Sequence, residues 1–256
     1  MSRTLISVLI LACSAALAGA QARSIDPALL SKANAGDAQA QFLAGQAYAQ
    51  GTGVDQDLKQ AAVWFRRAAD QGLAPAQLQL GLLYDHGDGV PQDFEQAAGW
   101  YRKAALQNSA EAQYNLGVLY ERGEGVPRDY AQAADLYRRA ANQGLASAQF
   151  NLALLYDNGQ GVERDYAQAA AWYRKAAEHG VPRAQFNLGS MYAGGQGVPV
   201  DLVEAYVWFD LSARLWSGSH QQQAASARDQ VAAHLNPADL AKAQNRVATW
   251  LAAWQK

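Results

Sequence analysis

Apolar and polar positions recur along this chain with a period of 36 residues between residues 37 and 219. Within each period two stretches carry apolar residues at helical spacing, which predicts two helices per repeat. A glycine-rich turn separates them in five copies, Gly51–Asp57, Gly87–Asp93, Gly123–Asp129, Gly159–Asp165 and Gly195–Asp201. A fixed period over five copies indicates a stacked-repeat solenoid, because each repeat must bury its apolar face against a neighbour.

The helix ends are also marked in every repeat. The predicted first helices begin at Ala38, Ala74, Ala110, Ala146 and Pro182. Each is expected to stop one turn after a recurring tyrosine, where glycine supplies the positive φ that a helix end needs. The second helix begins at a recurring aspartate, such as Asp57, with Gln or Glu three residues later. This spacing predicts a capping box and a structural role for the aspartates.

Small and large residues alternate where the two helices of a repeat are expected to cross. Gly45 and its equivalents are predicted to allow close approach of the helices. The bulky core residues are predicted to be Trp64, Trp100, Trp172 and Trp208, with Leu136 at this position in the third repeat. Aromatic residues at this spacing are typical of a core and rarely of a ligand site.

Shorter helical segments are predicted at both ends of the array. Residues 23–36 form a capping half-repeat that starts at Asp26, followed by Pro27 in the first helical position. Residues 220–256 form two helices separated at Asn236, and the second carries an apolar face that is expected to cover the last repeat. Docking of Trp250 and Trp254 onto another molecule is the alternative.

The first 22 residues have the pattern of a secretory signal peptide. An apolar run from Leu5 to Leu17 follows Arg3 and ends in small residues, which allow cleavage after Ala20 or Ala22. The run is short for a membrane span. We therefore expect a periplasmic or secreted protein without a membrane span.

The single cysteine, Cys13, lies inside this segment. It resembles the acylated cysteine of a bacterial lipoprotein, although Leu11 is bulky where that motif has a small residue. An outer-membrane lipoprotein with a lipid anchor at Cys13 is therefore the alternative location. The repeats contain no thiol, which excludes disulfides and cysteine-based metal sites there.

Composition and charge narrow the function further. Half of the residues are apolar, the formal net charge is -2, and the Lys and Arg residues are scattered, so nucleic acid is an unexpected partner. The four histidines lie in different repeats or caps without carboxylates at catalytic or metal-binding spacing. The Gly-x-Gly turn follows a helix and not a strand, so it does not resemble a phosphate-binding loop. No catalytic site, metal site or cofactor is predicted.

The repeat A-x-A-Q-[FY]-N-L-G-x-x-Y-x-x-G-x-G-V-x-x-D resembles the Sel1-like repeat. The similar copies span residues 37–73, 74–109, 110–145, 146–181 and 182–219. The resemblance implies an all-α fold, a right-handed α/α superhelical solenoid of five helix-turn-helix repeats related to tetratricopeptide repeats. It also implies a role in protein–protein contacts and assembly.

Two classes of function stay open on these grounds. The first is a non-catalytic scaffold or adaptor that binds a protein or peptide partner in the cell envelope. The second is a secreted penicillin-binding or β-lactam-hydrolysing protein, because the family includes cysteine-rich secreted members reported to bind penicillins. Those members have disulfides within their repeats, and the repeats of this chain have no cysteine.

A candidate binding face lies on the first helices of the third to fifth repeats, on the side turned away from their second helices. It is expected to be concave, with aromatic rings that bury side chains of an extended peptide and amides that bond its backbone. The alternative is that the rings fill the interface with the next repeat and the amides join helix ends. The candidate residues are Tyr114, Asn115, Val118, Glu121, Arg122, Phe150, Asn151, Asp157, Phe186 and Asn187.

Overall fold

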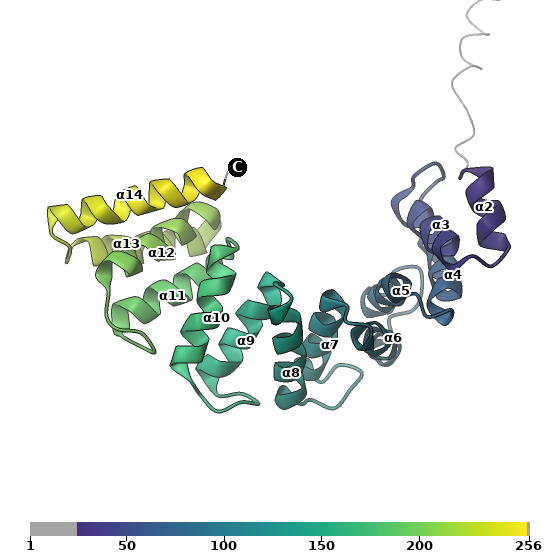
Figure 1. Ribbon diagram of the computed structural model, residues 1–256, viewed down its shortest axis with the longest axis horizontal. Coiled ribbons are helices and arrows are strands. Elements are labelled where there is room, and N and C mark those ends of the chain that lie inside the picture. The colour runs from purple at the N-terminus through teal and green to yellow at the C-terminus, as the bar shows by residue number, and fades with distance from the viewer. Residues whose placement is uncertain (1–24, 255–256) are drawn as a thin grey trace, which may run out of the picture. The chain divides into compact units, whose positions relative to one another are not determined.

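The computed structural model describes residues 25–254, so the predicted signal peptide and Cys13 lie outside the described residues. All regular secondary structure in this range is helical (Figure 1). The helices are α2 (Pro27–Asn34), α3 (Ala38–Gln50), α4 (Leu58–Asp70), α5 (Ala74–His86), α6 (Phe94–Leu106), α7 (Ala110–Arg122), α8 (Tyr130–Asn142), α9 (Ala146–Asn158), α10 (Tyr166–Glu178), α11 (Pro182–Gly194), α12 (Leu202–Leu215), α13 (Gly218–Ala232) and α14 (Pro237–Trp254). Five helix pairs, α3–α4 to α11–α12, form an all-α solenoid.

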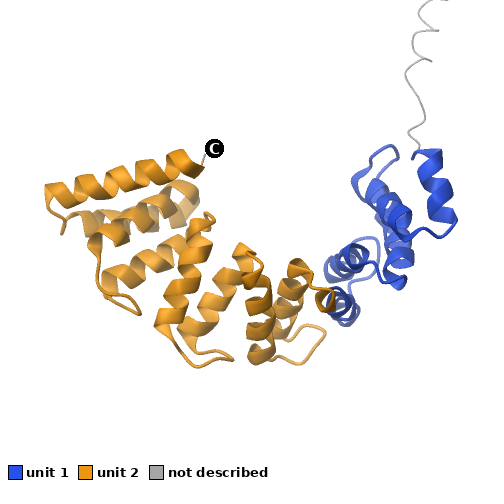
Figure 2. Cartoon of the chain, in the orientation of Figure 1, with its two compact units in different colours: residues 1–104 blue, residues 105–256 orange. Residues whose placement is uncertain are grey.

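The chain divides into two compact units, residues 1–104 and residues 105–256, with the boundary near the end of α6 (Figure 2). In unit 1, Phe65, Leu80 and Trp100 belong to one buried cluster. In unit 2 the buried clusters lie around Tyr137 and around Tyr173. Each cluster joins side chains of consecutive helices, as expected when a repeat buries its apolar face against its neighbour.

The turn of one repeat packs on the backbone of the repeat before it. Gly161 has φ +68°, and a Cβ placed on it would lie 2.2 Å from the carbonyl carbon and oxygen of Tyr130. Gly197 has the same relation to Tyr166, again at 2.2 Å. Only glycine fits there, because both the backbone conformation and the space exclude a side chain.

The predicted capping box is half confirmed. Asp129 Oδ1 accepts hydrogen bonds from the backbone N–H groups of Ala131 and Gln132 at 2.9 and 3.0 Å. The return bond predicted from the Gln132 side chain was wrong, because the Asp129 N–H donates to the Tyr120 carbonyl at 2.9 Å. The same Asp-to-Tyr backbone bond occurs in all five repeats, so each cap is tied to the preceding first helix.

A buried glutamine in each first helix connects successive helix pairs. Its Nε2 donates to a carbonyl at the end of the preceding second helix, at 3.0–3.3 Å. Gln113 Oε1 in turn accepts from Gln143 Nε2 at 2.8 Å. The residue equivalent to Gln143 is His179 in the fourth repeat, and there the buried Gln149 Oε1 has no hydrogen-bond partner.

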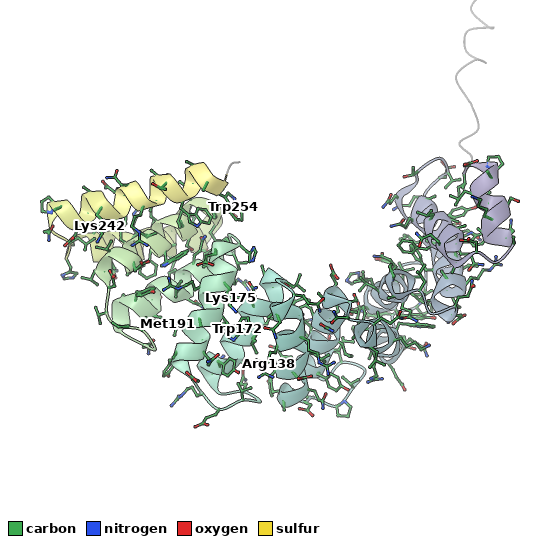
Figure 3. The ribbon with its side chains drawn as sticks, in the orientation of Figure 1. Arg138, Trp172, Lys175, Met191, Lys242 and Trp254 are labelled. Carbon is green, nitrogen blue, oxygen red and sulfur yellow. The ribbon has the colours of Figure 1, made fainter. Side chains whose placement is uncertain are left out.

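The C-terminal helices cover the fifth repeat. Asp210, which is 3% exposed, binds Arg214 at 2.8 Å and Arg228 of α13 at 2.9 Å. In α14, Val247 is buried in the cluster of the last repeats. Trp254, which is labelled in Figure 3, lies near the end of α14. Its ring stacks on that of Trp250 with centroids 5.0 Å apart. Most of the apolar face of α14 is thus occupied within the chain.

Candidate peptide-binding face

The ten predicted binding residues all lie on α7, α9 and α11 of unit 2. Nine of them are half-buried, and Arg122 is exposed. We call the surface formed by these ten residues the ladder face. Its residues are neither core nor fully solvated, so each has one side committed to packing and another side open.

The aromatic rings of the ladder face pack on the second helix of their own repeat. Tyr114 lies 5.7 Å from Tyr137, measured between ring centroids, and Phe150 lies 5.9 Å from Tyr173. Phe186 repeats the contact with Phe209 at 5.3 Å. These offset, tilted contacts fix the rings, and the packing accounts for the buried side of each ring.

The two acidic residues of the ladder face accept hydrogen bonds from buried tyrosines. The Tyr137 hydroxyl donates to Glu121 Oε2, and the Tyr173 hydroxyl donates to Asp157 Oδ2 at 3.2 Å. Burial, and then the neighbouring carboxylate, raises the pKa of both tyrosines far above the ordinary value of 10. Both hydroxyls therefore keep their protons at neutral pH and hold the carboxylates in place.

The amides of the ladder face reach the same tyrosines from the next repeat. A hydrogen bond from Asn151 acts on the Tyr137 hydroxyl and one from Asn187 acts on the Tyr173 hydroxyl, in each case lowering the pKa of the tyrosine against the stronger raising effects. We call the two resulting sets, Glu121–Tyr137–Asn151 and Asp157–Tyr173–Asn187, the triads. Each triad joins two repeats at the ladder face.

Tyr114 adds a further connection between α7 and α9. Its pKa is raised, first by burial and then by the charge of Glu121, whereas hydrogen bonds from Ser147 and Asn151 lower it. Phe150 replaces Tyr114 in the fourth repeat and has no hydroxyl, so Asn187 has no such second partner there. The amide of Asn187 is therefore less occupied within the chain than that of Asn151.

Sequence reasoning missed the tyrosines of the triads, although the repeats contain the signal. An acidic residue precedes a tyrosine by 16 residues in three repeats, as Asp85–Tyr101, Glu121–Tyr137 and Asp157–Tyr173. Where alanine replaces the acid, phenylalanine replaces the tyrosine, as Ala49–Phe65 and Ala193–Phe209. This joint change indicates that the carboxylate and the hydroxyl are needed together.

One feature borders the site residues in unit 2, and the equivalent position in unit 1 differs. Trp216 lies 6.3 Å from Phe186 and stacks on His220 at 4.5 Å, so aromatic residues continue past α11. In unit 1 the position of Asn115 is taken by Leu43, which lies with Leu29 in an apolar recess of about 400 Å³. The asparagine at this position thus belongs to the third, fourth and fifth repeats, whereas the carboxylate–tyrosine bond also occurs in the second repeat, as Tyr101 to Asp85.

Fold and site together define a helical-repeat protein with a polar and aromatic face on its first helices. The Sel1 repeat family model matches residues 38–73, 74–109, 110–145, 146–181 and 182–215. The chain belongs to this family. No curated protein matches the chain in sequence.

Solved structures show the same architecture. A Sel1 repeat protein from Oxalobacter formigenes is 34% identical over 76% of this chain and 84% of that chain, with a TM-score of 0.65. A protective antigen present in uropathogenic Escherichia coli strains, which displays an SLR fold, is 36% identical with a TM-score of 0.51. The match covers 86% of this chain and 55% of that chain.

Sel1 repeats form scaffolds that mediate protein–protein interactions and are generally non-catalytic. Among residues 25–254, no helix combines the length and apolar character that crossing a membrane requires. In the same range no three His, Cys, Asp or Glu side chains come together as a candidate metal site. The ladder face presents aromatic rings, amides and carboxylates, which are groups for apolar contact and hydrogen bonding.

Proposed function

We propose that this protein is a non-catalytic adaptor that binds an extended protein or peptide segment in the cell envelope along the ladder face. The observation that carries the proposal is the recurrence of an aromatic ring and an asparagine, half-buried and half-open, in three consecutive repeats. An extended peptide has a regular alternation of side chains and backbone polar groups. Rings and amides at a regular spacing match that alternation.

The structure divides the roles of the ladder residues. The rings are anchored on the second helices, and the carboxylates are oriented by buried tyrosine hydroxyls. A face with fixed side chains loses little conformational entropy when a ligand binds. Val118 and Leu154 lie half-buried on α7 and α9 and supply apolar contact between the polar groups.

The expected location is the periplasm or the medium, with the lipid anchor at Cys13 as the alternative. The support for export is the signal-peptide pattern of residues 1–22. Osmotic-shock release of a protein that begins at Gln21 or Arg23 is the expected result. Retention in the membrane fraction with an acylated Cys13 would instead establish the lipoprotein.

The β-lactam alternative gains no observation in its favour. The four histidines, His86, His179, His220 and His234, are exposed and lie in or next to three different helices. His86 lies 3.8 Å from Asp88 and His220 stacks on Trp216. Neither contact includes a serine or cysteine nucleophile, which acyl transfer from a β-lactam requires.

Site-specific photocrosslinking tests the proposed face. A photoreactive phenylalanine analogue replaces Val118 of the ladder face or Leu154, its equivalent beside the ladder residues of α9, and Ala171, exposed on α10, is the matched control position. We expect a crosslinked partner from both ladder positions and none from position 171. Crosslinks from position 171 alone, with folded protein in all three variants by circular dichroism, would refute the ladder face as the binding site.

A further inference from the structure

The carboxylates of Glu121 and Asp157 differ from most of the other buried or half-buried acids of unit 2. Asp210 binds Arg214 and Arg228, Glu204 binds Arg246 at 2.8 Å, and Glu124 pairs with Arg122 at 3.6 Å. Asp165 caps α10, and Asp239 accepts from the Asn236 amide. Four of these acids have a cation or a helix end as their partner within the described chain, whereas Asp239 has the neutral amide of Asn236.

Glu121 and Asp157 have only a neutral partner, the hydroxyl of a buried tyrosine. Neither forms an ion pair with a described Lys or Arg side chain, although Arg122 follows Glu121 directly and pairs with Glu124 instead. Buried charges in proteins are normally paired with an opposite charge, and a half-buried charge bears part of the same desolvation cost. The two ladder carboxylates are thus negative charges that the chain itself leaves without a cation.

Each carboxylate has an oxygen open to a ligand. The tyrosine hydroxyls bond Glu121 Oε2 and Asp157 Oδ2, and the second oxygens are not among the buried side-chain atoms without a partner. Since these oxygens have no hydrogen-bond partner within the described residues, they are at least partly accessible to solvent. The tyrosine holds the carboxylate in one orientation, so a ligand that binds the open oxygen does not have to order the side chain first.

An aromatic ring accompanies each carboxylate on the same helix. Tyr114 precedes Glu121 by seven residues, and Phe150 precedes Asp157 by the same interval, which is about two helical turns and places them on one face. The charge of Glu121 acts on the Tyr114 hydroxyl. A long basic side chain has methylene groups and a cationic head, and rings and carboxylates are the groups that bind those two parts.

We infer that the triads bind basic side chains, arginine or lysine, of the partner segment, one at Glu121 and one at Asp157 in the next repeat. This inference rests on the proposed peptide-binding function and adds the charge of the partner. The partner is accordingly an extended basic segment and not an acidic or purely apolar one. Arginine suits the site better than lysine, because its planar guanidinium can bond the open oxygen and stack on a ring together.

The test uses a fluorescent peptide that alternates arginine with alanine, and the same peptide with citrulline in place of arginine. Citrulline keeps the shape and removes the charge. We expect the intact protein to bind the arginine peptide at least about tenfold more tightly, because charge-assisted hydrogen bonds exceed neutral ones by about 1 kcal/mol or more. Fluorescence anisotropy measures both affinities. Equal affinities would overturn the inference.

A pair of variants assigns the difference to the triads. Glu121→Gln with Asp157→Asn removes both charges but keeps an oxygen that accepts from each tyrosine hydroxyl, so the fold is retained. Asp135→Asn with Glu178→Gln makes the same charge change at exposed positions of α8 and α10. We expect about a tenfold loss of arginine-peptide affinity in the first pair and less than about twofold in the second.

The outcomes separate this inference from the proposed function. If the ladder positions crosslink to a partner but both charge pairs bind the arginine peptide equally well, the binding face stands and the basic partner is refuted. If the triad pair alone loses the arginine peptide, the inference is supported independently of the crosslinks. Equal losses in both pairs would show attraction by net charge and would refute a site at the triads.

Discussion

The third repeat, residues 110–145, and the fifth repeat, residues 182–215, differ at three sets of equivalent positions. The third has Tyr137 with Glu121, where the fifth has Phe209 with Ala193. Arg138 of the third donates to the Tyr156 hydroxyl of the next repeat at 3.2 Å. Its equivalent, Asp210, binds Arg228 of α13. At the third set of positions, Gln143 of the third repeat donates to Gln113. The fifth repeat has Leu215 and Gln185 at the equivalent positions.

These differences show how a repeated sequence ends its array. At this position a repeat that is followed by another repeat has an arginine, as Arg138, which contacts the tyrosine of the following first helix. The last repeat has Asp210 there instead, and this carboxylate binds an arginine of α13. The hydrogen bonds of Asp210 and Asp229 raise the pKa of Arg228 even though burial lowers it, so this arginine stays charged. The contact between Asp210 and Arg228 thus selects α13, and not a further repeat, as the neighbour of α12.

The largest effect on stability is expected for Asp210→Arg, which gives the fifth repeat the arginine that the third repeat has at the equivalent position, Arg138. The new cation would lie in a buried position next to Arg214 and Arg228. We expect a loss of about 3–5 kcal/mol in the free energy of unfolding, because buried like charges without a partner are strongly destabilising. Urea unfolding followed by circular dichroism measures it.

The matched control for Asp210→Arg is Asp229→Ala. Asp229 is exposed and binds the same Arg228 at 2.7 Å, so its removal should cost less than about 1 kcal/mol. Hydrogen exchange should speed up in residues 218–254 of the Asp210 variant first. A uniform increase over the whole unit, or equal losses in both variants, would refute the role of Asp210 as the anchor of the cap.

A smaller effect on stability is expected when Tyr137 and Glu121 of the third repeat are replaced by the phenylalanine and alanine found at the equivalent positions of the fifth repeat. Glu121→Ala leaves the buried Tyr137 hydroxyl without its carboxylate and should cost about 1–3 kcal/mol. The double variant with Tyr137→Phe should cost less than the sum of the two single changes, by about 1 kcal/mol. Thermal unfolding of the four proteins gives the coupling energy. Strict additivity would show that the two residues do not depend on each other.

The smallest effect is a gain in stability from His179→Gln. The new side chain is equivalent to Gln143 and should donate to the buried Gln149 Oε1, which has no partner. One added hydrogen bond to a buried acceptor should raise the free energy of unfolding by about 1 kcal/mol. His234→Gln, at an exposed position after α13, is the control and should change little. An equal or lower melting temperature in the His179 variant would contradict the prediction.

The fold could be predicted almost completely from the sequence because its determinants are local and repeated. Helix ends, caps and close contacts depend on residues within one period, and five copies reinforce each signal. The return bond of the capping box was predicted wrongly, since the Asp129 N–H finds its acceptor on the preceding helix at Tyr120. The capping-box pattern is read from the residues of one helix, so it does not account for a carbonyl of another helix that accepts the same N–H.

The candidate site was predicted only in part. A helical projection placed the ladder residues on one side of three helices, and the structure has these residues on α7, α9 and α11; whether they form a binding site stays a prediction. It did not reveal the triads, whose members come from three helices and two repeats. Tyr137 was not singled out from the sequence, because its place in the repeat does not show that its hydroxyl reaches the carboxylate of Glu121.

The contact of Gly161 on the carbonyl of Tyr130 also restricts how such a gene can change in length. The turn of one repeat meets the first residue of the preceding second helix, as Gly197 does at Tyr166 and Gly89 does at Leu58. An insertion of one residue between these contact points would rotate the following helix by about 100° and carry a side chain into the place of the glycine. Duplication or deletion of a whole repeat preserves every contact. Lineages of this protein should therefore differ by complete repeats, gained or lost through recombination between the copies.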